Sequence, residues 1–179
     1  MFENVPSSLL AKAKSIKLLI CDVDGVLSDG KVYYSNQGDE YKSFNIKDGL
    51  GIKQLLNNGI EVAIITGRES KIVAMRAREL GIRLVFQGKS DKRQAFQDII
   101  TQLNLSANQV AHVGDDLPDL PLMQLSNLGI CVADGHHYVR ENADWVTDSI
   151  GGQGAVREIA DLLLFSQDKL DSLHKAYLS

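Results

Sequence analysis

Apolar runs rich in isoleucine and valine alternate with segments of helical periodicity along most of the chain. The helical periodicity predicts helices over residues 48–58, 70–80, 90–103, 117–125 and 155 to about 175. The apolar runs are short enough for strands buried on both faces and lie at residues 16–21, 60–66, 84–87, 109–113 and 128–132. This alternation predicts an α/β fold, a doubly wound (Rossmann-like) parallel sheet with helices on both faces.

One stretch breaks the alternation directly after the first predicted strand. Residues 31–34 (KVYY) and 41–44 (YKSF) flank a turn that contains Asn36 and Gly38. Aromatic and β-branched residues around such a turn predict a short β-hairpin insertion, a flap at about residues 30–45. Since no repeat or linker divides the chain, we expect a single domain over residues 1–179 without a separate cap domain, ending in a tail at about 166–179.

Composition and charge exclude several classes of protein. The 179 residues include 19 Lys and Arg against 23 Asp and Glu, a net charge of −4, which argues against nucleic-acid binding. No apolar run is long enough for a membrane span or a signal peptide, so a soluble cytoplasmic protein is expected. Cys21 and Cys131 lie inside apolar runs, and we expect them to be reduced thiols in the core.

Carboxylates follow two of the predicted strands. Asp22 and Asp24 come directly after the first strand, and their alternate spacing places them on the same side of an extended chain. Asp115, Asp116 and Asp119 follow the fourth strand. Ligands bind at the carboxyl ends of the strands in sheets of this kind, and carboxylate oxygens suit Mg²⁺. The two groups together therefore predict a Mg²⁺ site.

Groups that could hold a phosphate are found at two other places. Thr66, Gly67 and Arg68 end the second strand and offer a hydroxyl, a backbone amide and a guanidinium. Lys92 falls near the start of a predicted helix, where its charge opposes the helix dipole. Each signal alone also fits an ordinary turn or a surface lysine.

Taken together, these residues resemble the four motifs of the haloacid dehalogenase superfamily of phosphohydrolases. The motifs occur in order: Asp22-Val23-Asp24, Thr66, Lys92, and residues 114–119 (GDDLPD). Residues 25–30, 42–52, 66–68 and 151–158 extend the likeness to the small, capless bacterial 3-deoxy-D-manno-octulosonate 8-phosphate phosphatases, so that the resemblance covers about residues 16–170. It implies removal of phosphate from an eight-carbon sugar acid on the way to lipopolysaccharide, with Mg²⁺ as cofactor.

The resemblance also implies a set of roles. Asp22 would be the nucleophile, Asp24 the acid and base, and Thr66 and Lys92 would hold the phosphoryl group. Asp22, the backbone carbonyl of Asp24 and Asp115 would bind Mg²⁺, while Asp116 and Asp119 would orient the metal shell or Lys92. The implied substrate-binding set is Asp24, Asn45, Ile46, Lys47, Asp48, Gly49, Lys53, Gly67, Arg68, Arg76 and Lys92. Lys47 and Lys53 stand where relatives often carry arginine.

Two other functions stay open at this point: a phosphatase for another sugar-acid phosphate, such as a sialic acid 9-phosphate, and a noncatalytic relative that acts as a binding module. A binding module would not need the Asp22/Asp24 pair. We also expect a homo-oligomer, a homotetramer by resemblance, in which the hairpin of one copy roofs the site of another. Residues 151–154 and the tail would close the site as a mobile lid.

Overall fold

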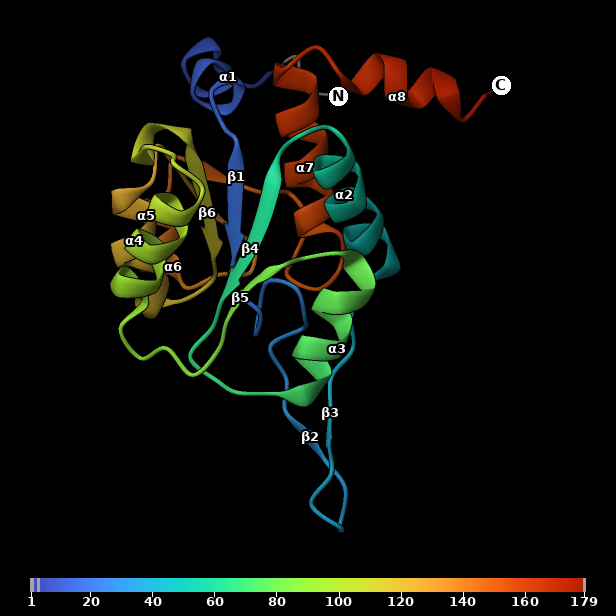
Figure 1. The fold of residues 1–179 in the computed structure, drawn as a ribbon, viewed down its shortest axis with the longest axis vertical. Helices are drawn as coiled ribbons and strands as arrows, with labels where there is room; N and C mark the ends of the chain where they lie inside the picture. Colours follow the sequence, from blue (N-terminus) through green and yellow to red (C-terminus); the bar gives the residue numbers. More distant parts are fainter. Residues whose placement is uncertain (1, 3, 179) are drawn as a thin grey trace.

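A six-stranded parallel sheet forms the centre of the computed structural model, which describes residue 2 and residues 4–178 (Figure 1). Residues 1 and 179, the ends of the predicted domain and tail, and residue 3 lie outside the described residues. The strand order is β5-β4-β1-β6-β7-β8, with β1 at Leu18–Cys21, β4 at Glu61–Ile65, β5 at Leu84–Phe86, β6 at Val110–Gly114, β7 at Leu128–Cys131 and β8 at Trp145–Val146. The predicted doubly wound α/β fold is confirmed.

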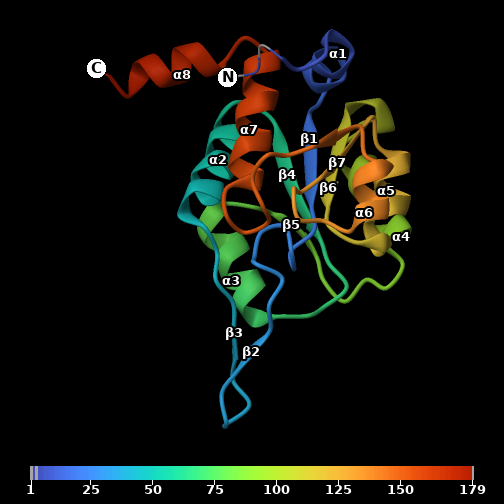
Figure 2. The same cartoon turned by 180° about the vertical axis from the view of Figure 1, so that it is seen from behind.

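Helices cover both faces of the sheet because successive strand residues point to opposite sides. Along β1, Leu19 and Cys21 belong to one core cluster, and Leu18 and Ile20 to the other. The first cluster packs under α2 (Ile46–Asn57), α3 (Lys71–Leu80) and α7 (Ala155–Ser166). The second packs under α4 (Lys92–Gln102), with α5 (Leu120–Leu125) on the same side, and Figures 1 and 2 show the two layers from both directions.

Four short elements escaped the sequence analysis, and several predicted boundaries differ from those of the structure. The missed elements are α1 (Ser7–Lys14), the 3₁₀ helix η1 (Ala107–Gln109), α6 (His137–Glu141) and β8. The last helix does not run to about residue 175: α7 ends at Ser166, Asp168 has a φ of +59°, and α8 (Leu170–Ala176) follows at a new angle. The helix predicted to begin at residue 90 begins at Lys92 instead, and its cap is Asp91, whose carboxylate accepts the Arg93 N–H at 3.0 Å.

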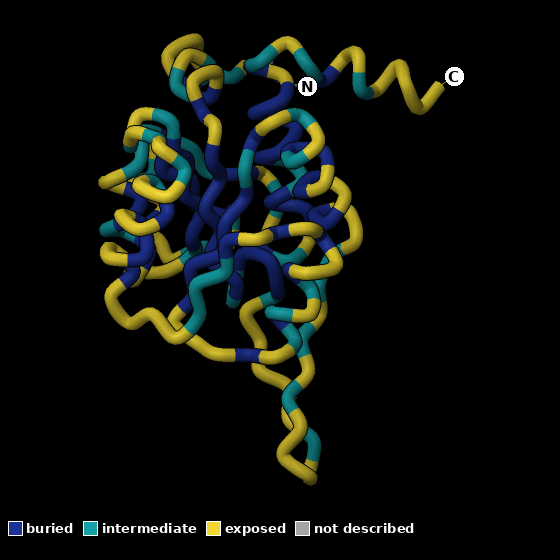
Figure 3. Tube along the Cα trace, viewed as in Figure 1, coloured by how far each residue is buried: buried dark blue, intermediate teal, exposed yellow. Residues whose placement is uncertain are grey.

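The predicted hairpin is present and projects from the body of the molecule. Its strands are β2 (Tyr33–Tyr34) and β3 (Glu40–Tyr41), which pair antiparallel. Figure 3 shows the hairpin exposed along most of its length. Tyr34 is 66% exposed and Tyr41 is 58% exposed. The hairpin tyrosines therefore find no core within their own chain, whereas Phe44 at the hairpin base packs against the first core cluster.

The expected lid does not match the structure of one chain. The backbone of residues 151–154 packs on the turn after β1: the Gly152 N–H donates to the Val26 carbonyl at 2.8 Å, and a Cβ on Gly151 would lie 1.7 Å from the Gly25 carbonyl oxygen. Helix α8 lies at the end of the molecule opposite the hairpin (Figures 1 and 2), and Leu170 at its start is buried in the core. The tail therefore cannot cover the carboxyl ends of the strands in its own chain. None of the described helices is long and apolar enough to cross a membrane.

Asp48 joins α2 to the start of α7. Its carboxylate, 2% exposed, accepts the backbone N–H groups of Gly154 at 3.2 Å and Arg157 at 2.8 Å. These N–H groups belong to the first turn of α7 or precede it, where a helix has no internal acceptors. Asp48 therefore serves as a cap for a helix that is more than a hundred residues away in sequence.

We predict that Asp48→Ala lowers the free energy of unfolding by about 2 kcal/mol, because it leaves two buried N–H groups without an acceptor. Urea denaturation measures this change. The matched control is Asp98→Ala: Asp98 is an exposed aspartate on α4 that accepts the Gln94 side-chain amide at 2.8 Å, and its loss should change stability little. An unchanged midpoint for Asp48→Ala would contradict the capping role.

Candidate active site

The four motifs converge on one cleft at the carboxyl ends of β1, β4 and β6. The central strand β1 pairs with β4 on one side and β6 on the other, so Asp22, Thr66 and Asp115 follow three neighbouring strands. The cleft, of about 330 Å³, is lined by Asp22, Asp24, Thr66, Gly67, Arg68, Lys89, Ser90, Lys92, Asp115, Asp116, Pro118 and Asp119. The structure thus brings together every residue predicted for the catalytic, metal-binding and supporting roles.

Two glycines allow close approaches in the acidic turns. Gly25 has a φ of +90°, and a Cβ there would lie 2.1 Å from Oδ2 of Asp115, so this glycine lets the turn after β1 approach the turn after β6. A Cβ on Gly114 would lie 2.3 Å from Cγ of Asp119, so the second glycine lets Asp119 fold back within its own turn.

Lys92 bridges two buried carboxylates that come from different segments. Its Nζ lies 2.7 Å from Oδ1 of Asp22 and 2.7 Å from Oδ1 of Asp119. As the first residue of α4, Lys92 opposes the helix dipole, and the two carboxylates offset that cost. The sequence predicted an anionic partner for Lys92 at a helix start, and the structure shows these two aspartates as its partners.

Two carboxylates that could bind the metal, those of Asp22 and Asp115, have pKa values above the usual range for aspartate. Burial raises the pKa of Asp22 to about 7, and the charge of Asp119 adds to this while Lys92 opposes it. Burial, followed by the charges of Asp119 and Asp22, also raises the pKa of Asp115 to about 7. Negative charge is therefore more concentrated here than the protein's own cations balance.

Asp119 is the member of the cluster that stays ionised. Burial opposes its charge, but its bond to His112 and the nearby Lys92 hold the pKa of Asp119 below its usual range. Burial lowers the pKa of His112, so at neutral pH its ring is an uncharged partner, 3.3 Å from Asp119. For Lys92, burial works against the charge, yet Asp22 and Asp119 outweigh it and raise the pKa. The charge of Lys92 therefore stabilises the ionised carboxylate of Asp119.

The donor set fits a magnesium ion. Carboxylate oxygens of Asp22, Asp115 and Asp119 all lie within 4.8 Å of one another. Oδ1 of Asp119 is engaged by Lys92, and its Oδ2 accepts the N–H groups of Asp115 at 3.1 Å and Asp116 at 3.4 Å. Asp22 and Asp115 keep oxygens that could bind the metal, and their role as ligands together with the Asp24 carbonyl stays a prediction. Against the charge of Lys92, the three carboxylates leave two negative charges, which a divalent cation balances.

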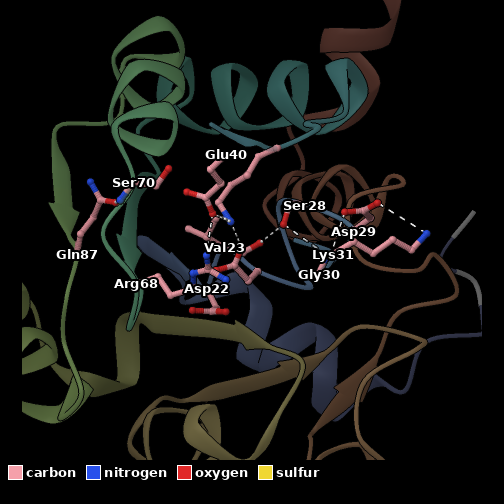
Figure 4. Close-up of polar contacts among 12 residues, drawn as sticks. Asp22, Val23, Ser28, Asp29, Gly30, Lys31, Glu40, Arg68, Ser70 and Gln87 are labelled. Atoms are coloured by element: carbon pink, nitrogen blue, oxygen red, sulfur yellow. Dashed lines mark hydrogen bonds and ion pairs between the residues drawn. The ribbon is translucent and has the colours of Figure 1, made fainter. Parts of the chain in front are cut away.

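The residues predicted to hold phosphate, Thr66, Gly67 and Arg68, line the side of the cleft at the end of β4. The Thr66 N–H donates to the Phe86 carbonyl at 2.9 Å, and its carbonyl accepts the Lys89 N–H at 3.1 Å, so this turn is fixed by β5 and the loop after it. Arg68, beside it, reaches toward the hairpin: Nη2 lies 2.8 Å from Oε1 of Glu40. Figure 4 shows Glu40 and Arg68 meeting beside Asp22.

The rest of the predicted substrate-binding set lies outside this cleft in one chain. Asn45, Asp48, Gly49 and Arg76 line a narrow cavity between α2 and α3, under the hairpin. Ile46 is 81% exposed on α2, and two lysines complete the group: Lys47 in a groove beside α7, and Lys53, which is exposed. In this chain Asp48 is a helix cap, and Arg76 contacts Glu79 at 2.9 Å. Their role toward a substrate stays a prediction.

Sequence reasoning missed a cation on the hairpin. Lys42, whose side chain is 1% exposed, contacts Oδ1 of Asp24 and lies 3.4 Å from Glu40. The available signal was the alternation of the predicted strand, which places Glu40 and Lys42 on one side of it. Nothing in the chain pattern showed that this side faces Asp24.

Comparisons with known proteins agree with the geometry of the cleft. A family model described as haloacid dehalogenase-like hydrolase matches residues 82–159. The chain is 52% identical to the 3-deoxy-D-manno-octulosonate 8-phosphate phosphatase of Escherichia coli K12 over 167 residues, which is 93% of this chain and 89% of that protein.

Solved structures show the same likeness in three dimensions. The phosphatase of that name from Yersinia pestis is 48% identical, with a TM-score of 0.92 over 93% of this chain and 90% of the other. The enzyme from Moraxella catarrhalis, crystallised with magnesium, phosphate and 3-deoxy-D-manno-octulosonate (KDO), is 43% identical, with a TM-score of 0.92 over 94% and 97%. With identity of this extent added to the four converging motifs, the chain belongs to the 3-deoxy-D-manno-octulosonate 8-phosphate phosphatase family of haloacid dehalogenase-like hydrolases.

Proposed function

We infer that this chain is a Mg²⁺-dependent phosphatase that hydrolyses 3-deoxy-D-manno-octulosonate 8-phosphate, a step toward lipopolysaccharide. The observation that carries the inference is the Asp22/Asp24 pair beside Lys92 and Asp115 in one cleft, within a chain 52% identical to an enzyme of that name. The same pair argues against a noncatalytic binding module, which would not need two adjacent acidic groups. The names of the relatives favour the eight-carbon sugar-acid phosphate over a nine-carbon sialic acid phosphate as substrate.

Asp22 is the proposed nucleophile, and its attack needs nearby cations. A phosphate monoester carries almost two negative charges at neutral pH, so a carboxylate about 4 Å away meets about 8 kcal/mol of repulsion at an effective dielectric constant of about 20. Lys92, 2.7 Å from Asp22, offsets part of this, and Thr66 and the amides after Asp22 would hold the phosphoryl oxygens. Bound at Asp22, the Asp24 carbonyl and Asp115, Mg²⁺ would supply further positive charge to the phosphoryl oxygens.

Asp24 is the proposed acid and base. The Asp22 carboxylate attacks phosphorus, the bond to the sugar oxygen breaks, and Asp24 gives its proton to the departing alkoxide. The product on the enzyme is an aspartyl-phosphate. Asp24, now ionised, takes a proton from the water that attacks this intermediate, and inorganic phosphate leaves. Asp22 and Asp24 thereby regain their starting states.

Arg68 is the proposed receptor for the carboxylate of the sugar acid. It lines the same cleft, and its guanidinium already holds a carboxylate, that of Glu40, at 2.8 Å. A guanidinium matches the two oxygens of a carboxylate, so a substrate with such a group gains contacts that a neutral sugar phosphate lacks.

A homo-oligomer, in which hairpins roof neighbouring clefts, is the assembly that we propose. The exposed tyrosines of the hairpin and Ile46, 81% exposed, support it, because a solvated cluster of this kind is typical of an interface. The tetramer number and a cytoplasmic location stay predictions from the sequence.

We predict that the purified chain releases phosphate faster from the eight-carbon sugar-acid phosphate than from a sialic acid 9-phosphate or glucose 6-phosphate. Asp22→Asn should lower kcat by about a hundredfold or more with its circular dichroism spectrum unchanged, because the amide is a poor nucleophile. Asp98→Asn is the control and should keep full activity. Substantial turnover by Asp22→Asn would disprove the nucleophile, and a preference for a different substrate would disprove the substrate assignment.

Magnesium should raise Tm, and by more at pH 8 than at pH 6. Asp22 and Asp115, with pKa values of about 7, must lose their protons to bind the ion, and below that pH protons compete with it. Differential scanning fluorimetry measures the shift. Asp115→Asn should abolish it, whereas Asp39→Asn on the exposed hairpin turn should not. An increase in Tm that is the same at both pH values would contradict this coupling.

Light scattering should give a mass several times the 19.7 kDa of one chain. The double variant Tyr34→Glu, Tyr41→Glu should lower that mass, because charge at a buried contact is costly. Tyr138→Glu is the matched control, since this residue on α6 is 51% exposed and lies away from the hairpin. A monomeric wild-type protein with full activity would rule out the proposed roof.

A further inference from the structure

Four charged residues meet where the hairpin joins the cleft, and we call them the hairpin-base cluster: Asp24, Glu40, Lys42 and Arg68. Lys42 contacts Oδ1 of Asp24 and lies 3.4 Å from Oε1 of Glu40. Arg68 places Nε 3.8 Å from Oδ2 of Asp24 and Nη2 2.8 Å from the same oxygen of Glu40. When both carboxylates are ionised, the two cations balance them. Lys42 contacts Oδ1 of Asp24, whereas Oδ2, 3.8 Å from Arg68, is the oxygen that would carry the proton for the acid step.

Burial sets Lys42 apart from the rest of the hairpin. Its side chain is 1% exposed, whereas the neighbouring Tyr41 is 58% exposed. Lysine is rarely buried, because removing its charge from water is costly unless a partner compensates. An apolar side chain would anchor the hairpin base without that cost, so the contact with Asp24 needs an explanation beyond anchoring.

We propose that Lys42 is a positioning residue that holds the Asp24 carboxylate in the orientation required for proton transfer. The inference rests on the proposed acid and base role of Asp24. A general acid must lie within about 3 Å of the atom that takes its proton. Asp24 follows the end of β1, and Lys42 holds one oxygen of its carboxylate from a second segment, the hairpin. The hairpin thereby contributes to the chemistry of its own chain.

Lys42→Met and Lys42→Gln test the proposal in the full chain with Mg²⁺. The measurement is kcat/KM for the sugar-acid phosphate and for p-nitrophenyl phosphate, whose leaving group needs no proton. Lys42→Met should lose about tenfold on the first substrate and about twofold or less on the second, because only the first depends on the acid. Lys42→Gln keeps a hydrogen-bond donor and should show the same pattern to a smaller degree.

The matched control is Lys31→Met at the other side of the hairpin. Lys31 is solvent-exposed, with a side chain 72% exposed and 3.9 Å from Asp29, and its loss should leave both substrates unaffected. In an Asp24→Asn background, Lys42→Met should lower kcat/KM no further, since the group that it positions is already unable to donate.

Equal losses on the two substrates, or no loss on either, would overturn the role of Lys42. If Lys42→Met does not fold, Lys42→Gln decides the question by the same comparison. Failure of the proposed function is separate: if Asp24→Asn alone loses equally on both substrates, the acid role of Asp24 is wrong whatever Lys42 does. A loss specific to the sugar-acid phosphate in Asp24→Asn but absent in both Lys42 variants rejects the positioning role alone.

Discussion

The contact of Lys92 with Asp22 and Asp119 is the interaction on which the cleft depends. Three carboxylates at the ends of β1 and β6 would repel each other, and burial makes that repulsion stronger. Lys92 comes from a third segment, α4, and joins the other two with one ammonium group. Asp119, held ionised in this way, accepts the backbone N–H groups of its own turn and so shapes the acidic loop around Asp115.

The grouping of the predicted catalytic residues followed from the sequence because parallel strands bring their carboxyl ends to one edge of the sheet. Once residues 16–21, 60–66 and 109–113 are strands, Asp22, Thr66 and Asp115 must lie near one another. The elements that escaped prediction lack such a constraint. Strand β8 has two residues, and the break after α7 occurs at Asp168, which adopts a left-handed conformation without the glycine that usually marks a helix end.

The predicted substrate-binding residues show what a resemblance does not predict, namely where each residue lies relative to the cleft. Motif matching identified Asp48 and Arg76, but it does not say whether a residue meets the substrate in its own chain, in another copy, or not at all. In this chain, both carboxylate oxygens of Asp48 accept backbone N–H groups at the start of α7. Lys42 shows the reverse case, because its contact with Asp24 depends on the angle at which the hairpin leaves the sheet, and no local pattern encodes that angle.

The pairing of β1 has a consequence for the order in which the chain folds. Its neighbours are β4 and β6, and Leu18 pairs with both Glu61 and Val110. Strand β1 therefore cannot pair until distant parts of the chain are present. Contacts between residues so far apart in sequence slow folding. During synthesis, Asp22, the proposed nucleophile, is made early, but its cleft cannot form until β6 and its acidic turn leave the ribosome. Phosphatase activity would therefore be confined to chains whose sheet is already assembled. Partly synthesised chains would be inactive because they lack the cleft.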